Sequence, residues 1–94
     1  MNTPDLPPGC EPVPSCLDYQ SFVFRLNQQS DVSRLCILGR VERADLGVIY
    51  VRAEWGFLVL PPPGFPELRV SFYRQVEEGR VQAWLDYVGT TLAG

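Results

Sequence analysis

Asp86 is the residue whose surroundings come closest to those of a catalytic or ligand-binding group. It lies in the apolar and aromatic segment 84–87, and burial in such surroundings raises the pKa of a carboxyl group, as in many functional sites. Tyr50 and Arg52 share one face of a predicted strand and can form a polar wall near it. The simpler interpretation is that Asp86 faces solvent and that Arg52 pairs with Glu54 on an exposed face. The candidate ligand-pocket residues are Tyr50, Arg52, Trp84 and Asp86.

The residue types needed for most enzyme chemistry are missing. All 8 basic residues are Arg, and the chain has neither His nor Lys, which removes the commonest general base, the commonest metal ligand and the Schiff-base amine. Cys10, Cys16 and Cys36 have no histidine to activate them and make a poor zinc site. Cys10 and Cys16 either form a disulfide across a proline-rich segment or stay reduced. We therefore predict no catalytic residue, metal site or cofactor, and favour a function that is not enzymatic.

Charge and hydropathy argue against two classes of partner. The net charge of −3 disfavours nucleic-acid binding, because neutralising phosphates needs an excess of cationic side chains. The longest uncharged segment, 55–66, is interrupted by prolines and is too short to cross a membrane. The N-terminal residues lack the basic and apolar regions of a signal peptide. We therefore expect a protein of the cytoplasm, with no nucleic-acid or membrane partner.

Aromatic residues and one rigid loop favour a protein partner instead. Arg69 and Tyr73 alternate along a predicted strand, and an arginine–aromatic stripe of this kind can stack on bases or bind an acidic peptide. A solvated sheet face is the commoner arrangement. The loop 61–66 holds Phe65 between Gly and Pro residues, so Phe65 is either a preorganised contact for a partner or a lid on the core. The candidate partner-surface residues are Trp55, Phe57, Pro62, Phe65, Arg69 and Tyr73.

The elements that must position these residues follow a proline-rich leader. Residues 1–15 contain few large apolar residues and are predicted to be disordered. Residues 17–28 are predicted to form a helix, because apolar residues at i, i+3, i+4 and i+7 from Tyr19 share one helical face. Phe22 and Phe24 alternate as in a strand, which leaves a second interpretation open.

The central part of the chain has the pattern of antiparallel strands. Segments 34–42 and 48–53 flank turn residues at 44–47 and are predicted to form a hairpin. The strand pattern continues over 55–60, and apolar residues alternate with polar ones over 68–73.

Residues near the C-terminus are compatible with two structures. Apolar residues from Val81 to Val88 have helical spacing, whereas segment 76–81 has the composition of a short hairpin loop with Gly79 at a left-handed position. A helix here would carry Gly79 in its first turns without a good N-cap residue. We therefore favour the hairpin.

The same region carries a family resemblance. It contains a Pro-Pro-Pro-Gly loop at 61–64, an alternating strand over 68–76, a Glu-Glu-Gly-Arg turn at 77–80 and a predicted strand that includes Asp86 and Tyr87. In these motifs the chain resembles the cone-shaped nuclear transport factor two-like proteins, which include the SnoaL-like polyketide cyclases and the limonene epoxide hydrolases. The resemblance implies a curved antiparallel sheet with a dimerising face, and an acidic pocket residue at Asp86.

These patterns together predict an α+β fold with a disordered leader (1–15) and one domain (16–94). In that domain an N-terminal amphipathic helix packs on a curved antiparallel sheet of four or five strands, arranged as a β-meander. A domain this small cannot cover both faces of its sheet, so the uncovered face is the predicted partner surface. We expect a non-catalytic interaction or regulatory module that is a homodimer or a subunit of a complex. The alternative is a cone-fold pocket protein that binds or transforms a hydrophobic small molecule near Asp86.

Overall fold

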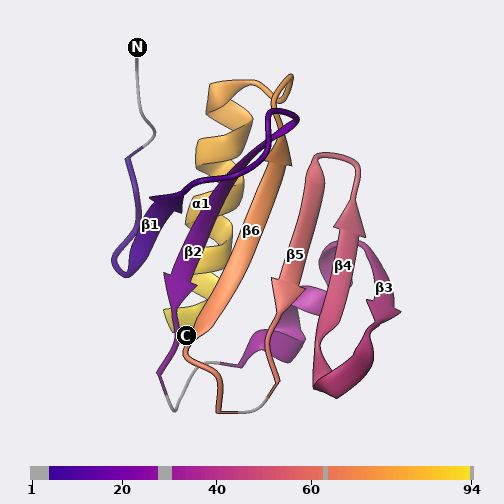
Figure 1. Ribbon diagram of the computed structural model, residues 1–94. Helices are drawn as coiled ribbons and strands as arrows, with labels where there is room; N and C mark the ends of the chain where they lie inside the picture. Colours follow the sequence, from indigo (N-terminus) through magenta and orange to yellow (C-terminus); the bar gives the residue numbers. More distant parts are fainter. Residues whose placement is uncertain (1–4, 28–30, 63, 94) are drawn as a thin grey trace.

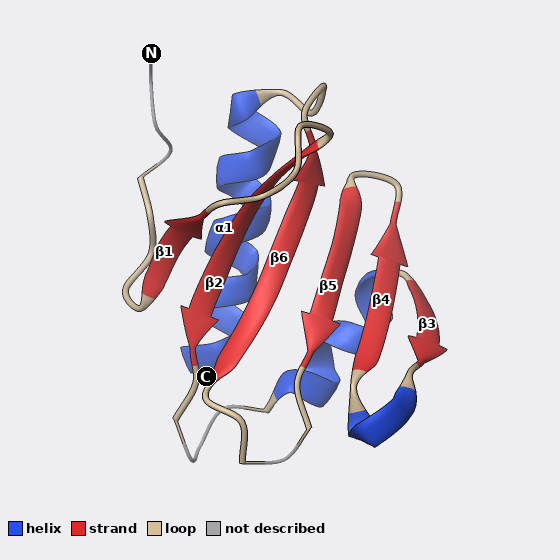
Figure 2. Ribbon diagram, in the orientation of Figure 1, coloured by secondary structure: helices blue, strands red, loops and turns tan. Residues whose placement is uncertain are grey.

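The computed structural model describes residues 5–27, 31–62 and 64–93. These residues form one antiparallel sheet with strand order β1-β2-β6-β5-β4-β3, and a helix covers one of its faces (Figures 1 and 2). The elements are the strands β1 (Cys10–Val13), β2 (Tyr19–Arg25), β3 (Arg40–Arg43), β4 (Ile49–Ala53), β5 (Gly56–Leu60) and β6 (Glu67–Tyr73), the 3₁₀ helices η1 (Val32–Leu38) and η2 (Asp45–Gly47), and the α-helix α1 (Glu78–Ala93).

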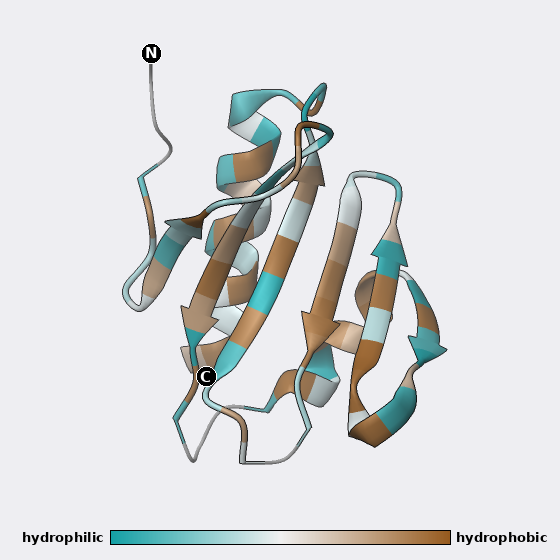
Figure 3. Ribbon diagram, viewed as in Figure 1, coloured by the Kyte–Doolittle hydropathy of each residue, from teal (hydrophilic) through white to brown (hydrophobic). Residues whose placement is uncertain are grey.

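The core lies between α1 and the sheet face that we call the inner face. Side chains of a strand alternate between the two faces of a sheet, and the inner positions of β5 and β6 are all apolar and buried. Cross-strand pairs such as Phe24–Leu68, Val70–Leu58 and Leu58–Val51 extend this apolar layer across the central strands. Figure 3 shows β5 as hydrophobic along most of its length and β3, at the sheet edge, as mainly hydrophilic. The helix completes the core with Val81, Leu85, Val88 and Leu92, which are all buried.

A tryptophan in the turn between β4 and β5 joins the sheet to the first half of α1. The side chain of Trp55 is 2% exposed, and its ring centroid lies 4.9 Å from that of Phe72 and 5.2 Å from that of Trp84. At the surface of this contact, Arg80 Nη2 donates to Glu54 Oε1 at 2.9 Å. The turn and the helix are therefore held together by stacked rings below and an exposed ion pair above.

The predicted N-terminal helix over 17–28 is wrong. Residues Tyr19–Arg25 form β2, and residue 28 lies outside the described part of the chain. The same segment that has helical spacing from Tyr19 also alternates as a strand does. In the structure Phe22 and Phe24 point inward, and they are 5% and 2% exposed. Pairing with β1 on one side and β6 on the other decides the conformation, because tertiary contacts override local helix propensity.

The predicted disordered leader is also wrong over the residues that the structure describes. Cys10–Val13 form β1, Leu6 packs against the core, and Gln82 Nε2 in α1 donates to the carbonyl oxygen of Asp5 at 2.6 Å. A Cβ atom added to Gly89 would lie 3.0 Å from the Cβ atom of Pro7, so this proline lies directly against the helix. The proline-rich segment therefore covers one edge of the sheet and one side of α1.

The predicted C-terminal hairpin is replaced by a helix. Residues Glu78–Ala93 are helical, and the buried Val81, Leu85, Val88 and Leu92 fall on one face. Gly79 is accommodated in the first turn of α1, where nothing lies within 4 Å of an added Cβ atom. The strand with Asp86 and Tyr87 that the family resemblance implied is therefore absent. The helix has neither the length nor the apolar character needed to cross a membrane, and no other helix in the described residues has them.

The sheet also differs from the prediction in its central region. It has six strands rather than four or five, and most of segment 34–42 belongs to η1 rather than to a strand. Asp31 caps η1, because its carboxylate accepts hydrogen bonds from the backbone N–H and the hydroxyl of Ser33. These hydrogen bonds hold the pKa of Asp31 below its usual value. The hairpin around 44–47 is present as β3 and β4, and the coarse prediction of a small α+β domain with an antiparallel sheet is confirmed.

The three cysteines are free, and they lie in different environments. Cys10 is on the inner face opposite Phe24 and is 6% exposed. Burial, with a smaller contribution from the charge of Glu11, raises its pKa to about 11.

Iodoacetamide at pH 8 should therefore modify the exposed Cys16 rapidly and leave Cys10 unmodified in the folded protein, because the thiolate is the reactive form. Peptide mass spectrometry after timed quenching measures both rates. Rapid modification of Cys10 under native conditions would contradict its placement in the core, and modification in denaturant is the control.

Candidate interaction surface

In the part of the chain that the structure describes, no helix lies over the sheet face opposite α1, which we call the outer face (Figure 1). The connection between β1 and β2 passes on this side, where Arg69 Nη2 donates to the carbonyl oxygen of Pro14 at 3.2 Å. Directly paired residues of antiparallel strands lie on the same face, so the strand registers define its members. Its apolar and aromatic residues are Val13, Tyr19, Val23, Tyr50, Phe57, Val59 and Tyr73, all of intermediate exposure.

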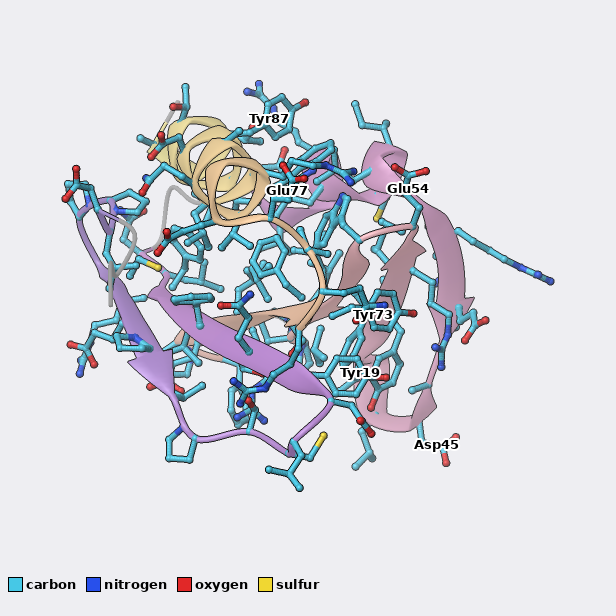
Figure 4. All side chains as sticks on the ribbon, turned by 90° about the horizontal axis from the view of Figure 1, so that it is seen from above. Tyr19, Asp45, Glu54, Tyr73, Glu77 and Tyr87 are labelled. Carbon is cyan, nitrogen blue, oxygen red and sulfur yellow. The ribbon has the colours of Figure 1, made fainter. Side chains whose placement is uncertain are left out.

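Three aromatic rings of the outer face form a cluster across β2, β6 and β5. The ring centroid of Tyr19 lies 5.5 Å from that of Tyr73, its direct partner in the register, and 5.3 Å from that of Phe57 in an edge-to-face arrangement. Figure 4 shows Tyr19 and Tyr73 side by side, away from Tyr87 on α1. Edge-to-face and offset ring pairs hold aromatic side chains in fixed orientations. The cluster is therefore a preorganised patch rather than three independent side chains.

An ion pair borders this aromatic cluster. Arg52 is the direct partner of Phe57 in the register, and its Nε atom donates to Glu42 Oε2 at 2.9 Å. The hydrogen bond and the charge of Glu42 raise the pKa of Arg52 above its usual value, with a smaller contribution from Tyr73 and Tyr19. The guanidinium group is therefore fixed beside the rings by Glu42.

Small residues lie beneath the centre of the outer face. Ser21 and Ser71 are paired across β2 and β6, and their hydroxyl oxygens are 2.8 Å apart. They are 5% and 2% exposed although no helix covers them, because larger neighbours flank them. This hydrogen bond gives each of the two hydroxyl groups a partner within the sheet.

The structure divides the partner-surface candidates between three places. Phe57, Arg69 and Tyr73 lie on the outer face. Trp55 lies in the core against α1. Pro62 and Phe65 belong to the loop at one end of the sheet, where Phe65 is 61% exposed.

The ligand-pocket candidates are not brought together. Tyr50 and Arg52 lie on the outer face of β4, whereas Trp84 and Asp86 belong to α1, which packs on the inner face. Asp86 is exposed and accepts a hydrogen bond from Gln82 Nε2 at 3.0 Å. The pairing of Arg52 with Glu54 is also wrong, because Arg52 pairs with Glu42 and Glu54 pairs with Arg80. The geometry therefore does not assemble the four candidate residues into one site.

Two residues of the outer face, Tyr19 and Glu42, were not predicted as site residues from the sequence. Tyr19 was assigned to a helix, although the alternation of Phe22 and Phe24 after it placed it on the opposite side of a strand. Glu42 was part of a predicted strand, but a turn at 44–47 would pair it with Ile49, whereas the observed loop is 44–48 and pairs it with Tyr50, two positions from Arg52. The loop is one residue longer than predicted, and this places Glu42 on the same face as Arg52.

Within the described residues, no group of three or more His, Cys, Asp or Glu side chains is arranged to hold a metal ion. Comparison of the chain with protein-family models, with curated proteins and with solved structures finds no match. The outer face is accordingly interpreted from its own geometry and charge.

Proposed function

We propose that this protein is a non-catalytic interaction module that self-associates through the outer face of its sheet. The observation that carries the proposal is the fixed cluster of Tyr19, Phe57 and Tyr73 beside Arg52 on a face that no helix covers. Tyrosine and arginine are the residue types that, with tryptophan, contribute most to binding energy at protein interfaces. Rings that are already held in place lose little conformational freedom when a partner covers them.

Charge favours a second copy of the chain as the partner. The strand registers bring four arginines and three glutamates to the outer face, so this face carries a net charge of +1 in a chain of net charge −3. Two copies therefore meet with less repulsion through this face than through the rest of their surfaces. A twofold interface presents the same residues from both sides, so arginines of one copy can lie opposite glutamates of the other. These residues are Arg25, Arg40, Arg52, Arg69, Glu11, Glu42 and Glu67.

The cytoplasm is the proposed compartment. Its support is the three free thiols of the folded chain, since disulfides are rare in the reducing cytoplasm.

Sedimentation equilibrium of the purified protein should give a mass of twice 10.6 kDa at micromolar concentrations. Phe57→Arg places a charge in the aromatic cluster and should weaken the dimer at least about tenfold. Tyr73→Ala, which removes a ring without adding charge, should weaken it in the same direction.

The matched control is Ile37→Arg. Ile37 is 79% exposed in η1, and η1 contacts α1 and lies on the inner side of the sheet, so the same added charge should leave the dimer intact. Circular dichroism checks that each variant is folded. A monomer at every concentration, or a dimer that Phe57→Arg and Ile37→Arg affect equally, would exclude the outer face as a dimer interface.

A further inference from the structure

A cavity of about 670 Å³ lies at the end of the sheet where β5 leads into the loop 61–66. Ligand pockets of small-molecule-binding proteins typically have volumes of about 300–1,000 Å³. The cavity is half-open, and none of the outer-face residues and none of the candidates around Asp86 line it. It is therefore separate from the proposed dimer interface.

Three walls form the cavity. The first wall is the inner face of the sheet, where Ile49 of β4 is paired with Leu60 of β5. Val32 and Cys36 of η1 form a second wall, and Phe65 with its neighbouring prolines forms the third. The 3₁₀ helix η1 is only 7 residues long and α1 packs over the other half of the sheet (Figure 1), so η1 covers this corner of the inner face only in part.

The third wall is largely rigid before any ligand binds. Pro61, Pro62 and Pro66 each fix their own φ angle. The loop closes with hydrogen bonds from Phe65 N to Pro62 O at 3.1 Å and from Leu26 N to Pro66 O at 2.7 Å. A preformed wall of this kind lowers the entropy lost on binding.

The chemistry of the lining selects an uncharged ligand. The described residues of the lining include no Arg, Asp or Glu, and most are aliphatic, proline or aromatic. The hydroxyl group of Ser33 is already donated to Asp31 Oδ1. An ionic ligand would lose its hydration without gaining a charged partner here, whereas an apolar molecule would exchange water for contact with the three apolar walls.

We propose that this cavity, lined by Val32, Cys36, Ile49, Leu60 and Phe65, is a binding site for an uncharged, mainly apolar small molecule. The exposed Phe65 covers the ligand, and the side chains of η1 and the sheet surround its apolar body.

Nile red, an uncharged dye whose emission strengthens and shifts to the blue in apolar surroundings, tests the proposal by fluorescence titration. We expect saturable binding of one dye per chain. Phe65→Ala removes a ring that is largely exposed and should weaken binding about tenfold without unfolding the protein. Cys36→Trp fills the cavity and should weaken binding more strongly.

The matched control for the truncation is Leu17→Ala, which removes an exposed apolar side chain (89% exposed) from the connection between β1 and β2. It should leave binding unchanged. Because Cys36 lines the cavity and Cys16 is remote in the fold, saturating dye should slow the modification of Cys36 by iodoacetamide about fivefold and leave Cys16 unaffected. Circular dichroism confirms that the variants are folded.

Four results would overturn the proposal. The first is the absence of saturable binding, and the second is binding that Leu17→Ala weakens as much as Phe65→Ala does. The third is an unchanged modification rate of Cys36 at saturating dye. The fourth is displacement of Nile red by an equal concentration of the anionic dye anilinonaphthalene sulfonate. The third result places the dye elsewhere on the surface, and the last contradicts the selection of an uncharged ligand. None of these results depends on the oligomeric state, so the ligand-site proposal and the dimer proposal are tested independently of each other.

Discussion

Gly56→Ala is expected to destabilise the fold strongly. An added Cβ atom at Gly56 would lie 1.9 Å from the carbonyl oxygen of Ser71, and φ at this residue is +153°. Both atoms belong to backbone that is paired between β5 and β6, so neither can move without breaking the centre of the sheet. Strain at the disallowed φ and the clash together should cost at least about 3 kcal/mol, which corresponds to a fall in melting temperature of more than about 12 °C.

The control is Gly79→Ala, the same chemical change in the first turn of α1. Nothing lies within 4 Å of the added methyl group, and alanine favours a helix over glycine by about 0.5–1 kcal/mol. This variant should therefore melt slightly higher than the parent. Thermal unfolding by circular dichroism compares the two, and a Gly56→Ala variant that is as stable as the parent would contradict the close approach of β5 to β6.

Trp55→Ala is the second change with a large expected effect. The indole ring is 2% exposed and lies between Phe72 of the sheet and Trp84 of the helix. Truncating a buried aromatic residue costs about 3–5 kcal/mol, which approaches the whole stability of many small domains. We expect Trp55→Ala to be largely unfolded at 37 °C, with loss of the near-ultraviolet circular dichroism signal of the stacked rings.

Tyr87→Ala provides the comparison. Tyr87 also contacts Trp84 edge-to-face, but it is 42% exposed. Its truncation should cost about 1 kcal/mol. Equal effects of the two substitutions on the denaturant midpoint would show that Trp55 does not connect the sheet to α1 as the structure indicates.

The sequence predicted the elements whose pattern is local. The turn at 44–47 and the alternation over 68–73 depend on neighbouring residues, and both are present in the structure. The two errors at the ends arose where one pattern satisfied two periodicities. Phe22 satisfied both, Phe24 fitted only the strand, and long-range pairing with β6 decided for a strand. At Gly79 a single residue was given more weight than the helical spacing from Val81 to Val88.

The candidate sites show the same dependence on tertiary contacts. Phe57, Arg69 and Tyr73 could be assigned to one face because each follows the alternation of its own strand. The burial of Trp55 could not be predicted in this way, because a tryptophan in a turn is buried only when another element packs over it. In this protein that element is α1. The cavity beside Phe65 had no sequence signal, since Ile49, Leu60 and Cys36 come from three separate elements.

During synthesis on the ribosome, β2 cannot pair with β6 until β6 has been made. Ser21 and Ser71 are 50 residues apart in the chain, and a ribosome adds about 5–20 residues per second, so β2 waits roughly 3–10 s for its partner strand. During that interval only β1 is available to pair with it, and Phe22 and Phe24 have neither β6 nor α1 to cover them. The local hairpins of β3, β4 and β5 form much sooner, because short loops close fastest. During synthesis, the apolar side chains of β2 are therefore without their final neighbours for several seconds.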